Sequence, residues 1–314
     1  MTVAAVVVSY ESREELPGCL EALLDASPPP RVIVVDNASS DGSAALVRER
    51  FGAEVTLLAL DRNTGFTGGC NRGFDAAEGA EVVAFLNPDV RVDRDCLGAA
   101  AACLERTGAA GVAPLLLRPG RGIVDSAGQC LARWTLEVAD RGYGRPLDAA
   151  YLEPRPVLAA CGALAVFRRE ALEAVRLGCG VLDEGLFCFW EDLELGWRLW
   201  NAGFTVRSCP EAVAVHGRGA GAGPGRGPLR WRRPPALEAR IVLNKWRVLA
   251  RHVHPLDLLP RLPLLLARDC GLAAAGVLRR PVLLRRLAAL LPGTVRAWTA
   301  RGRRRRLRLK ELPC

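Results

Sequence analysis

Continuous apolar runs alternate with amphipathic stretches through the N-terminal part of the chain. Residues 3–9 (VAAVVVS), 31–36 (RVIVVD) and 82–86 (VVAFL) are rich in β-branched side chains, which is typical of strands buried on both faces of a mainly parallel sheet. Residues 14–26 place leucines at helical spacing between the first two runs. The remaining expected elements are helices over residues 43–51 and 71–78 and a strand over residues 55–60. This alternation predicts an α/β fold, whose ligands bind beyond the carboxyl ends of the strands.

The later part of the chain is less regular. Residues 111–167 contain short apolar stretches broken by glycine and proline, which predicts mixed strand pairing in the second half of the sheet. Residues 217–235 are rich in glycine and proline and indicate a flexible loop or linker. Residues 236–314 show the spacing of amphipathic helices followed by a basic tail. We therefore expect an α/β domain over residues 1–216, the linker, and a helical region.

The positive charge of the chain is concentrated near its end. Lysine and arginine number 43 against 34 acidic residues, and seven of the basic ones lie between Arg301 and Lys310. Such a cluster attracts anionic lipid headgroups or nucleic acid, or simply stays solvated. Peripheral contact with a membrane and a packed helical cap with a solvated tail are equal expectations here. Nucleic-acid binding is less expected, because an aromatic-basic surface pattern is suggested only by residues 230–233 (RWRR).

The cysteines and the apolar segments indicate a compartment. The 11 cysteines form no CxxC pair, and the apolar run at residues 2–9 has neither the basic start nor the cleavage site of an export signal. These features predict a reduced, cytoplasmic location, and the helical region with its basic tail suggests peripheral contact with the inner face of the membrane. Residues 255–295 are apolar but interrupted by arginines, so they offer no continuous span of the ~20 apolar residues that a bilayer crossing needs.

Polar side chains follow three of the predicted strands. Tyr10 and Glu11 come after the first strand, Asp36 ends the second, and Asn87 and Asp89 follow the strand at residues 82–86. A carboxylate at the position of Asp36 can accept hydrogen bonds from a base or a ribose, although the serine-rich turn after it also caps a helix. Asp89 offers the hard oxygen that Mg²⁺ or Mn²⁺ prefers, although an Asn-Pro-Asp sequence alone is also an ordinary turn.

A glycine-rich segment occupies residues 63–73 (NTGFTGGCNRG) and begins with Asn63 and Gly65. It predicts a backbone that approaches a ligand closely before a helix starts. A dehydrogenase is not indicated, because the glycine fingerprint of that class should directly follow the first strand, where this chain has SYES.

The segment from residue 183 to residue 204 predicts a helix with an acidic first turn. One face carries Trp190, Leu193, Trp197 and Trp200. Glu191 and Asp192 lie in the first turn, where the helix dipole favours anions whether or not the acids have a function. Glu194 and Arg198 have the spacing of a surface ion pair.

The order of these segments resembles family 2 of the glycosyltransferases, which has the GT-A fold, and in particular its bacterial rhamnosyltransferase-like branch. The resemblance covers residues 1–217 and implies a GT-A domain with a mainly parallel, partly mixed central sheet. The segments that carry it are VVVSYES at 6–12, VVDNASSDGS at 34–43, NTGFTGGCNRG at 63–73, FLNPDV at 85–90, CGALAVFRREAL at 161–172 and LDEGLFCFWEDLELGWRLWNAGF at 182–204.

The resemblance implies where the donor binds. Its substrate-binding positions are Tyr10, Glu11, Asp36, Asn63, Gly65 and Asn87. Asp36 would contact the base or ribose of the nucleotide, and Asn63 and Gly65 would lie beside it. Two positions depart from the family pattern, because Glu11 stands where many relatives have asparagine and Asn87 stands where families with a full Asp-x-Asp motif have aspartate.

The resemblance also implies catalytic and metal-binding residues. Asp89 would hold a divalent metal, Mg²⁺ or Mn²⁺, that bridges the donor diphosphate, and Asp192 would be the general base beside a second acid, Glu191. His216 ends a short apolar stretch, where a histidine is either structural or a metal ligand. The resemblance places an additional metal ligand at this position.

These roles together imply an inverting hexosyltransferase. A sugar, with rhamnose as one candidate, would move from a nucleotide diphosphate donor to the hydroxyl of a saccharide or lipid-linked saccharide during synthesis of a cell-surface polysaccharide or glycolipid. A single in-line displacement needs a base and a metal but no covalent intermediate. Two other classes stay open: a catalytically silent nucleotide-sugar binding protein, which would not need Glu191 and Asp192, and a nucleic-acid-binding protein that uses the basic tail.

Overall fold

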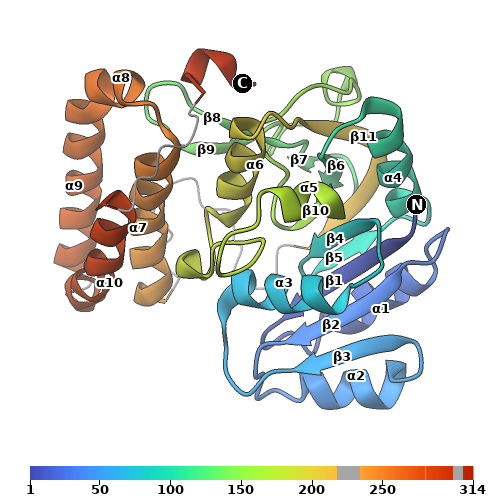
Figure 1. Cartoon of the computed structure of the whole chain (residues 1–314). Helices are drawn as coiled ribbons and strands as arrows, with labels where there is room; N and C mark the ends of the chain where they lie inside the picture. Colours follow the sequence, from blue (N-terminus) through green and yellow to red (C-terminus); the bar gives the residue numbers. More distant parts are fainter. Residues whose placement is uncertain (218–233, 280, 300–306, 314) are drawn as a thin grey trace.

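The computed structural model describes residues 1–217, 234–279, 281–299 and 307–313 (Figure 1). The predicted linker at residues 217–235 lies almost entirely outside these ranges, and so do most of the arginines of the basic tail. None of the described helices combines the length and the apolar character that crossing a bilayer requires.

A mixed β-sheet forms the centre of the N-terminal part. In the described residues its order is β3-β2-β1-β4-β10-β6-β11-β5, with β7 paired to β6, and β8 and β9 form a separate hairpin. The strands are β1 (Val3–Ser9), β2 (Arg31–Asp36), β3 (Val55–Ala59), β4 (Val82–Leu86), β5 (Val90–Val92), β6 (Gly111–Leu117), β7 (Val124–Ser126), β8 (Gln129–Leu131), β9 (Val138–Asp140), β10 (Leu164–Arg168) and β11 (Val206–His216). The strands from β3 to β4 are parallel, and β10 runs antiparallel to β4 and β6. The expected mainly parallel, partly mixed sheet is confirmed.

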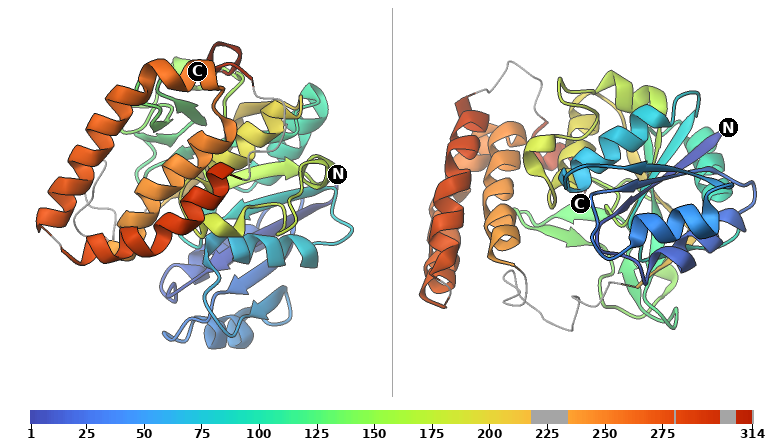
Figure 2. Two further views of the ribbon diagram at one scale, coloured as in Figure 1. Left: turned by 60° about the vertical axis from the view of Figure 1, so that its left-hand side comes forward. Right: turned by 90° about the horizontal axis from the view of Figure 1, so that it is seen from below.

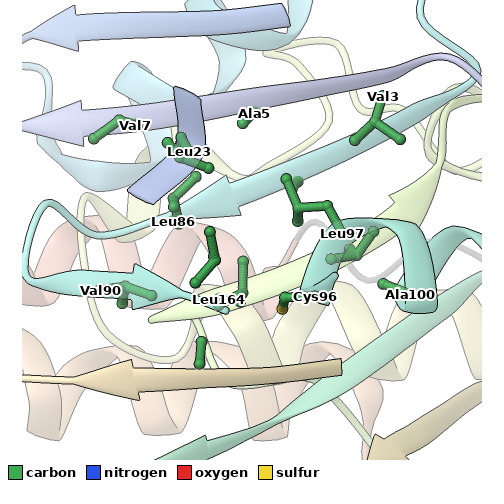
Figure 3. Packing of buried hydrophobic residues seen from close by; sticks show 14 of the residues in the cluster. Val3, Ala5, Val7, Leu23, Leu86, Val90, Cys96, Leu97, Ala100 and Leu164 are labelled. Atoms are coloured by element: carbon green, nitrogen blue, oxygen red, sulfur yellow. The ribbon is translucent and has the colours of Figure 1, made fainter. Parts of the chain in front are cut away.

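Helices cover both faces of this sheet. They are α1 (Leu16–Leu24), α2 (Ser43–Phe51), α3 (Gly65–Ala76), α4 (Cys96–Thr107), α5 (Arg169–Ala174) and α6 (Glu191–Asn201), with short 3₁₀ turns η1 (Ala149–Tyr151) and η2 (Glu184–Leu186). Because side chains alternate along a strand, Val3, Ala5 and Val7 of β1 pack with α1 and α4 (Figure 3), while Val6 and Val8 pack on the α3 side. This double burial explains why the strand reads as a continuous apolar run.

The helix α3 begins earlier than the sequence pattern predicts. It starts at Gly65 rather than at residue 71, so most of the glycine-rich segment is helical instead of an open loop. A Cβ atom on Gly73 would lie 2.1 Å from Val6 Cγ1, and one on Gly69 would lie 2.6 Å from Val8 Cγ1. These two glycines therefore allow the helix to approach the sheet closely, which the sequence pattern does not distinguish from approach to a ligand.

The C-terminal part is helical, as expected. Its elements are α7 (Pro235–His252), α8 (Pro255–Leu258), η3 (Leu259–Arg261), α9 (Leu262–Arg279), α10 (Val282–Thr299) and η4 (Leu309–Glu311). The helix α7 packs on α6 through an apolar cluster that includes Leu193, Trp197, Val248 and Leu249. The helices α9 and α10 lie on the side of α7 that faces away from the sheet (Figure 2).

Candidate active site

The carboxyl end of β2 carries a buried carboxylate with one unused oxygen. Asp36 is 2% exposed, and its Oδ2 accepts a hydrogen bond from the backbone N–H of Ser39 at 3.0 Å. Its Oδ1 is buried and has no hydrogen-bond partner among the described residues. Burial of a hydrogen-bond acceptor without a partner costs about 1–3 kcal/mol of solvation free energy. A ligand that supplies a donor removes this cost. This geometry fits the predicted contact with a base or ribose, and that contact remains a prediction.

Two predicted substrate-binding residues follow β1. Tyr10 is exposed. Glu11 has a positive φ of 50°, and its Oε1 accepts hydrogen bonds from the backbone N–H and hydroxyl of Ser40 at 2.7 and 3.0 Å. Glu11 therefore links the end of β1 to the turn after β2, through hydrogen bonds that its carboxylate accepts from Ser40.

The other predicted nucleotide contacts surround Asn37, which sequence reasoning did not assign. Asn37 is buried, donates to the carbonyl of Gly65 at 3.1 Å and accepts from the backbone N–H of Thr64 at 3.1 Å. Asn63 Oδ1 accepts from the backbone N–H of Gly65 at 2.8 Å. The position of Asn37 directly after Asp36 was the available signal, because both leave the same strand end.

A second group of polar side chains lies where β5 and β11 pair. His216 is directly opposite Val90, so this pairing brings His216 next to Asp89 although they are far apart in sequence. Nε2 of His216 lies 3.4 Å from Asp89 Oδ2, and its Nδ1 lies 2.8 Å from Asp125 Oδ2. Asp125 comes from β7 and is fully buried. The structure thus brings together the two predicted metal ligands and adds Asp125, which sequence reasoning missed.

The two carboxylates on either side of the His216 imidazole, those of Asp89 and Asp125, favour its protonated form. Burial alone would lower the pKa of His216, but the hydrogen bonds and charges of Asp125 and Asp89 outweigh it and raise the pKa to about 9. A carboxylate on one imidazole nitrogen with the other nitrogen directed at a metal is a common arrangement around metal-binding histidines. Among the described residues no cluster of three or more histidine, cysteine or acidic side chains is placed to hold a metal alone. Asp89 and His216 therefore fit an ion that takes its other ligands from phosphates and water.

The turn before α6 has an unusual backbone. Phe187, Phe189 and Trp190 have φ angles of 65°, 67° and 74°, in the left-handed region that costs side-chain-bearing residues energy. Asn244 of α7 holds this turn, because its Nδ2 lies 2.8 Å from the carbonyl oxygen of Leu186 and 3.0 Å from those of Cys188 and Phe189. A residue of the C-terminal region thus fixes the start of α6.

The two acids at that helix start have different surroundings. Asp192 Oδ2 accepts from Gln129 Nε2 at 2.8 Å and from the backbone N–H of Gly162 at 3.1 Å, while Oδ1 accepts from the backbone N–H of Leu193 at 2.8 Å. Burial raises the pKa of Asp192, and these three donors oppose the rise. Sequence reasoning did not identify Gln129, because its short strand β8 shows no clear periodicity.

Glu191 has no comparable set of donors. Its Oε2 is buried and has no hydrogen-bond partner among the described residues. Burial, followed by the charge of Asp192, raises the pKa of Glu191 to about 8. Glu191 is therefore mostly protonated at neutral pH, whereas the donors around Asp192 favour its anion.

A short segment connects the acid end of α6 to the loop of Asp89. Gly162 donates to Asp192, and the carbonyl of the next residue, Ala163, accepts from the backbone N–H of Asn87 at 3.0 Å. The pairing of β10 with β4 continues from this point, with Leu164 opposite Leu86. The predicted base and the predicted metal loop therefore lie at the same end of the sheet.

The prediction that Glu194 and Arg198 pair at the surface is wrong, because the pair is buried. The two side chains do form an ion pair, at 3.0 Å, but they are 0% and 4% exposed. His252 of α7 contacts Glu194 Oε1 at 3.0 Å. The spacing correctly predicts the pair, but it does not show that α7 covers this side of α6.

Comparison with known proteins identifies several relatives. A family model described as glycosyl transferase family 2 matches residues 4–176. The N-acetylglucosaminyl-diphospho-decaprenol L-rhamnosyltransferase of Mycobacterium tuberculosis is 32% identical over 235 residues, which cover 67% of this chain and 74% of that protein. The succinoglycan biosynthesis protein ExoO of Rhizobium meliloti is 38% identical over 94 residues, 29% of this chain and 27% of that protein.

Solved structures show the same fold. A mannosyltransferase from Pyrobaculum calidifontis in complex with GDP-Man and Mn²⁺ aligns with a TM-score of 0.55 and 18% identity, over 95% of this chain and 87% of that one. GalNAc-T7 with UDP, GalNAc and Mn²⁺ aligns with a TM-score of 0.59 and 15% identity. That alignment covers 80% of this chain, which spans about half (48%) of the GalNAc-T7 chain. At these identities the likeness concerns the fold alone, which is the expected GT-A arrangement.

Proposed function

This chain belongs to glycosyl transferase family 2, and from that membership we propose that it transfers a hexose, with rhamnose as the first candidate, from a nucleoside diphosphate donor to an acceptor hydroxyl with inversion. The observation that carries the proposal is the connection between Asp192 and the loop of Asp89 through residues 162–163. A carboxylate base and a diphosphate-binding acid must flank one sugar for in-line transfer. The silent-binding alternative receives no support from the relatives.

We assign the donor to the carboxyl ends of β1, β2 and β4. The unpartnered Oδ1 of Asp36 would accept a hydrogen bond from the nucleoside, next to the loop that Asn37 and Asn63 hold. Asp89 and His216 would hold a divalent metal, with Asp125 orienting the imidazole. A bound Mg²⁺ or Mn²⁺ stabilises the negative charge that develops on the leaving diphosphate.

We assign the base to Asp192. The acceptor hydroxyl would give its proton to Asp192 as its oxygen bonds to the anomeric carbon and the bond from that carbon to the diphosphate oxygen breaks. Gln129 and the backbone N–H of Gly162 hold Oδ2 of Asp192 in place. The contribution of Asp192 to the rate would therefore come from its position beside the acceptor hydroxyl rather than from strong basicity. Glu191, neutral at pH 7, would act as a hydrogen-bond donor to a substrate oxygen.

The acceptor proposed here is a lipid-linked saccharide. The Mycobacterium tuberculosis relative is named for a decaprenol-linked acceptor, and eight exposed large apolar side chains of this chain lie between residues 256 and 291. Such side chains and the arginines between them fit contact with the surface of an anionic membrane from the cytoplasmic side.

Replacement of the base tests this function. Asp192→Asn should lower the rate of sugar transfer about 10²- to 10⁴-fold, because general-base catalysis contributes that much, while binding of the nucleoside diphosphate sugar with Mn²⁺ stays unchanged in calorimetry. Asp95→Asn is a matched control, since Asp95 is exposed at the start of α4 and makes no side-chain cap. Full transfer by Asp192→Asn would contradict the assignment. Donors and metals are found first by thermal shift.

A further inference from the structure

The turn before α6 contains a strained γ-turn centred on Phe187. The φ and ψ angles of Phe187 are 65° and −58°, and the backbone N–H of Cys188 donates to the carbonyl of Leu186 at 2.7 Å. A γ-turn of this hand is rare, and such strain persists only where the surrounding structure holds it in place. Asn244 of α7 holds the turn from one side. The helix α3 holds Phe187 from another.

Phe187 contacts the first turn of α3. Its carbonyl accepts a hydrogen bond from the backbone N–H of Thr67 at 3.1 Å, and this N–H is one of the first four of the helix, which have no partner within it. The Phe187 ring lies against Gly65, where a Cβ atom would be 2.6 Å from ring atoms Cγ and Cδ2. Cζ of Arg240 on α7 lies 4.2 Å from the centroid of the ring. Phe187 therefore contacts both α3 and α7.

The same turn of α3 is connected to the proposed nucleotide site. The side-chain amide of Asn37 donates to the carbonyl of Gly65 and accepts from the backbone N–H of Thr64, each at 3.1 Å. Asn37 directly follows Asp36, whose buried Oδ1 has no partner among the described residues. A nucleoside at Asp36 would therefore restrain Gly65 through Asn37, and the opposite contact of Gly65 is with Phe187.

Further contacts join α3 to the residues that precede Phe187. Asn71 is 3% exposed, its Oδ1 accepts from the backbone N–H of Leu182 at 2.8 Å, and its Nδ2 donates to the carbonyl of the same residue at 3.0 Å. Arg72 forms an ion pair with Glu184 at 2.8 Å. The segment that leads to the proposed base is therefore fastened to α3, beside which it runs (Figure 1).

We infer that Phe187 is a positioning residue that links the donor to the base: through the contacts of Phe187 with α3, a bound nucleotide stabilises the strained turn that orients Asp192. This inference rests on the proposed function. A ligand favours the conformation to which it binds better, and here the restraint passes from Asn37 through Gly65 to Phe187. The acceptor hydroxyl then meets an aligned base when the donor is present. Alignment matters because a displacement of about 1 Å can lower a rate about 10²-fold.

Hydrogen exchange tests this link without any sugar transfer. UDP, GDP, dTDP, ADP and CDP are each added with Mn²⁺ to the full-length protein, and calorimetry identifies those that bind. A bound nucleotide should slow exchange of the backbone N–H groups in the peptide that spans residues 184–192. Phe187→Ala removes the ring, so this variant should bind the nucleotide and lose the slowing. Phe187→Tyr keeps the ring against Gly65 and should retain the slowing.

Kinetics separate positioning from a purely structural role. Phe187→Ala should lower kcat per folded molecule about 10²-fold and change the KM for the donor by less, and Phe187→Tyr should restore kcat. Tyr151→Ala is the matched control. The Tyr151 ring also lies against a glycine of positive φ, Gly142 at 81°, and 5.4 Å from the Cζ atom of an arginine, Arg141, but it belongs to η1. This variant should keep the wild-type kcat and the wild-type exchange.

Several results would overturn the inference. Nucleotide binding that leaves exchange of residues 184–192 unchanged in the wild type would show that the turn is independent of the donor. Equal slowing in Phe187→Ala and the wild type, or a wild-type kcat of this variant, would show that Phe187 does not position the base. An equal loss of kcat in Tyr151→Ala would assign the effect to a general loss of packing. Absence of binding by all five nucleotides would refute the proposed function, and the inference with it.

Discussion

The hydrogen bond from Gln129 to Asp192 should control how the transfer rate depends on pH. Gln129 is 4% exposed, and its Nε2 lies 2.8 Å from Asp192 Oδ2. The variant Gln129→Leu removes this donor and keeps a buried side chain of similar size. A hydrogen bond to a charged group contributes about 1.5–3 kcal/mol, and 1.36 kcal/mol corresponds to one pKa unit. Loss of the bond therefore favours the protonated carboxyl of Asp192.

The sign of the effect follows from the need for an ionised base. Because burial already raises the pKa of Asp192, a further rise moves the acid limb of the kcat/KM profile upward, by about one to two pH units. Transfer by Gln129→Leu should thus fall at the acid end of the profile, relative to the wild type, and recover as the pH rises. The assay is sugar transfer at subsaturating acceptor across this pH range, with donor binding measured in parallel.

The control lies on the same strand. Cys130→Ala changes the next residue of β8, whose side chain points to the opposite face of the hairpin, and should keep the wild-type profile. An equal loss of rate at every pH, or weaker donor binding with an unchanged profile, would refute the role of Gln129 as the residue that positions the base.

Three further perturbations have defined outcomes. Asp125→Asn should weaken Mn²⁺-dependent donor binding about 10- to 100-fold, because it alters the partner of His216, and calorimetric titration with Mn²⁺ measures this; unchanged Mn²⁺ affinity would separate Asp125 from the metal. Asn244→Ala should lower the free energy of unfolding, measured by urea denaturation, by about 1–3 kcal/mol, since three carbonyls of the turn lose their donor. An unchanged free energy would show that these hydrogen bonds do not stabilise the turn. Glu191 has its pKa raised to about 8, mainly by burial, so the unfolded chain releases its proton first and this residue makes stability fall as pH rises from about 4.5 to 8. Glu191→Gln should therefore reduce the loss of melting temperature between pH 5 and pH 8. An equal loss in the variant and the wild type would show that another group causes this pH dependence.

The strands that build the site could be predicted because of where they lie. β1, β2 and β4 are buried on both faces, so their composition alone predicts nearly the observed bounds. Asp36, the last residue of β2, and Asp89, in the loop after β4, could be predicted for the same reason. A residue that ends a strand, or follows it in the sequence, lies at the carboxyl end of that strand whatever the rest of the fold is.

Other parts depend on contacts that chain order does not reveal. Asp125 and Gln129 belong to short strands, and each reaches its partner only because β11 and α6 return to the sheet. The burial of Glu194 depends on α7, which lies much later in the chain. The start of α3 at Gly65 was missed because glycine disfavours helices in general, whereas here close packing on Val6 and Val8 outweighs that preference.

The contacts of Asn244 with the turn before α6 make the C-terminal helix α7 a support for the two proposed catalytic acids. A fragment ending after β11 would still contain Asp36, Asp89, Asp125, Glu191 and Asp192. The left-handed residues that position the last two would nevertheless lack their anchor. We therefore expect that shortening the protein to its sheet-bearing part lowers the proposed transfer activity, although the proposed base is retained. A helix that contributes none of the proposed reacting groups thus determines how two of them are oriented.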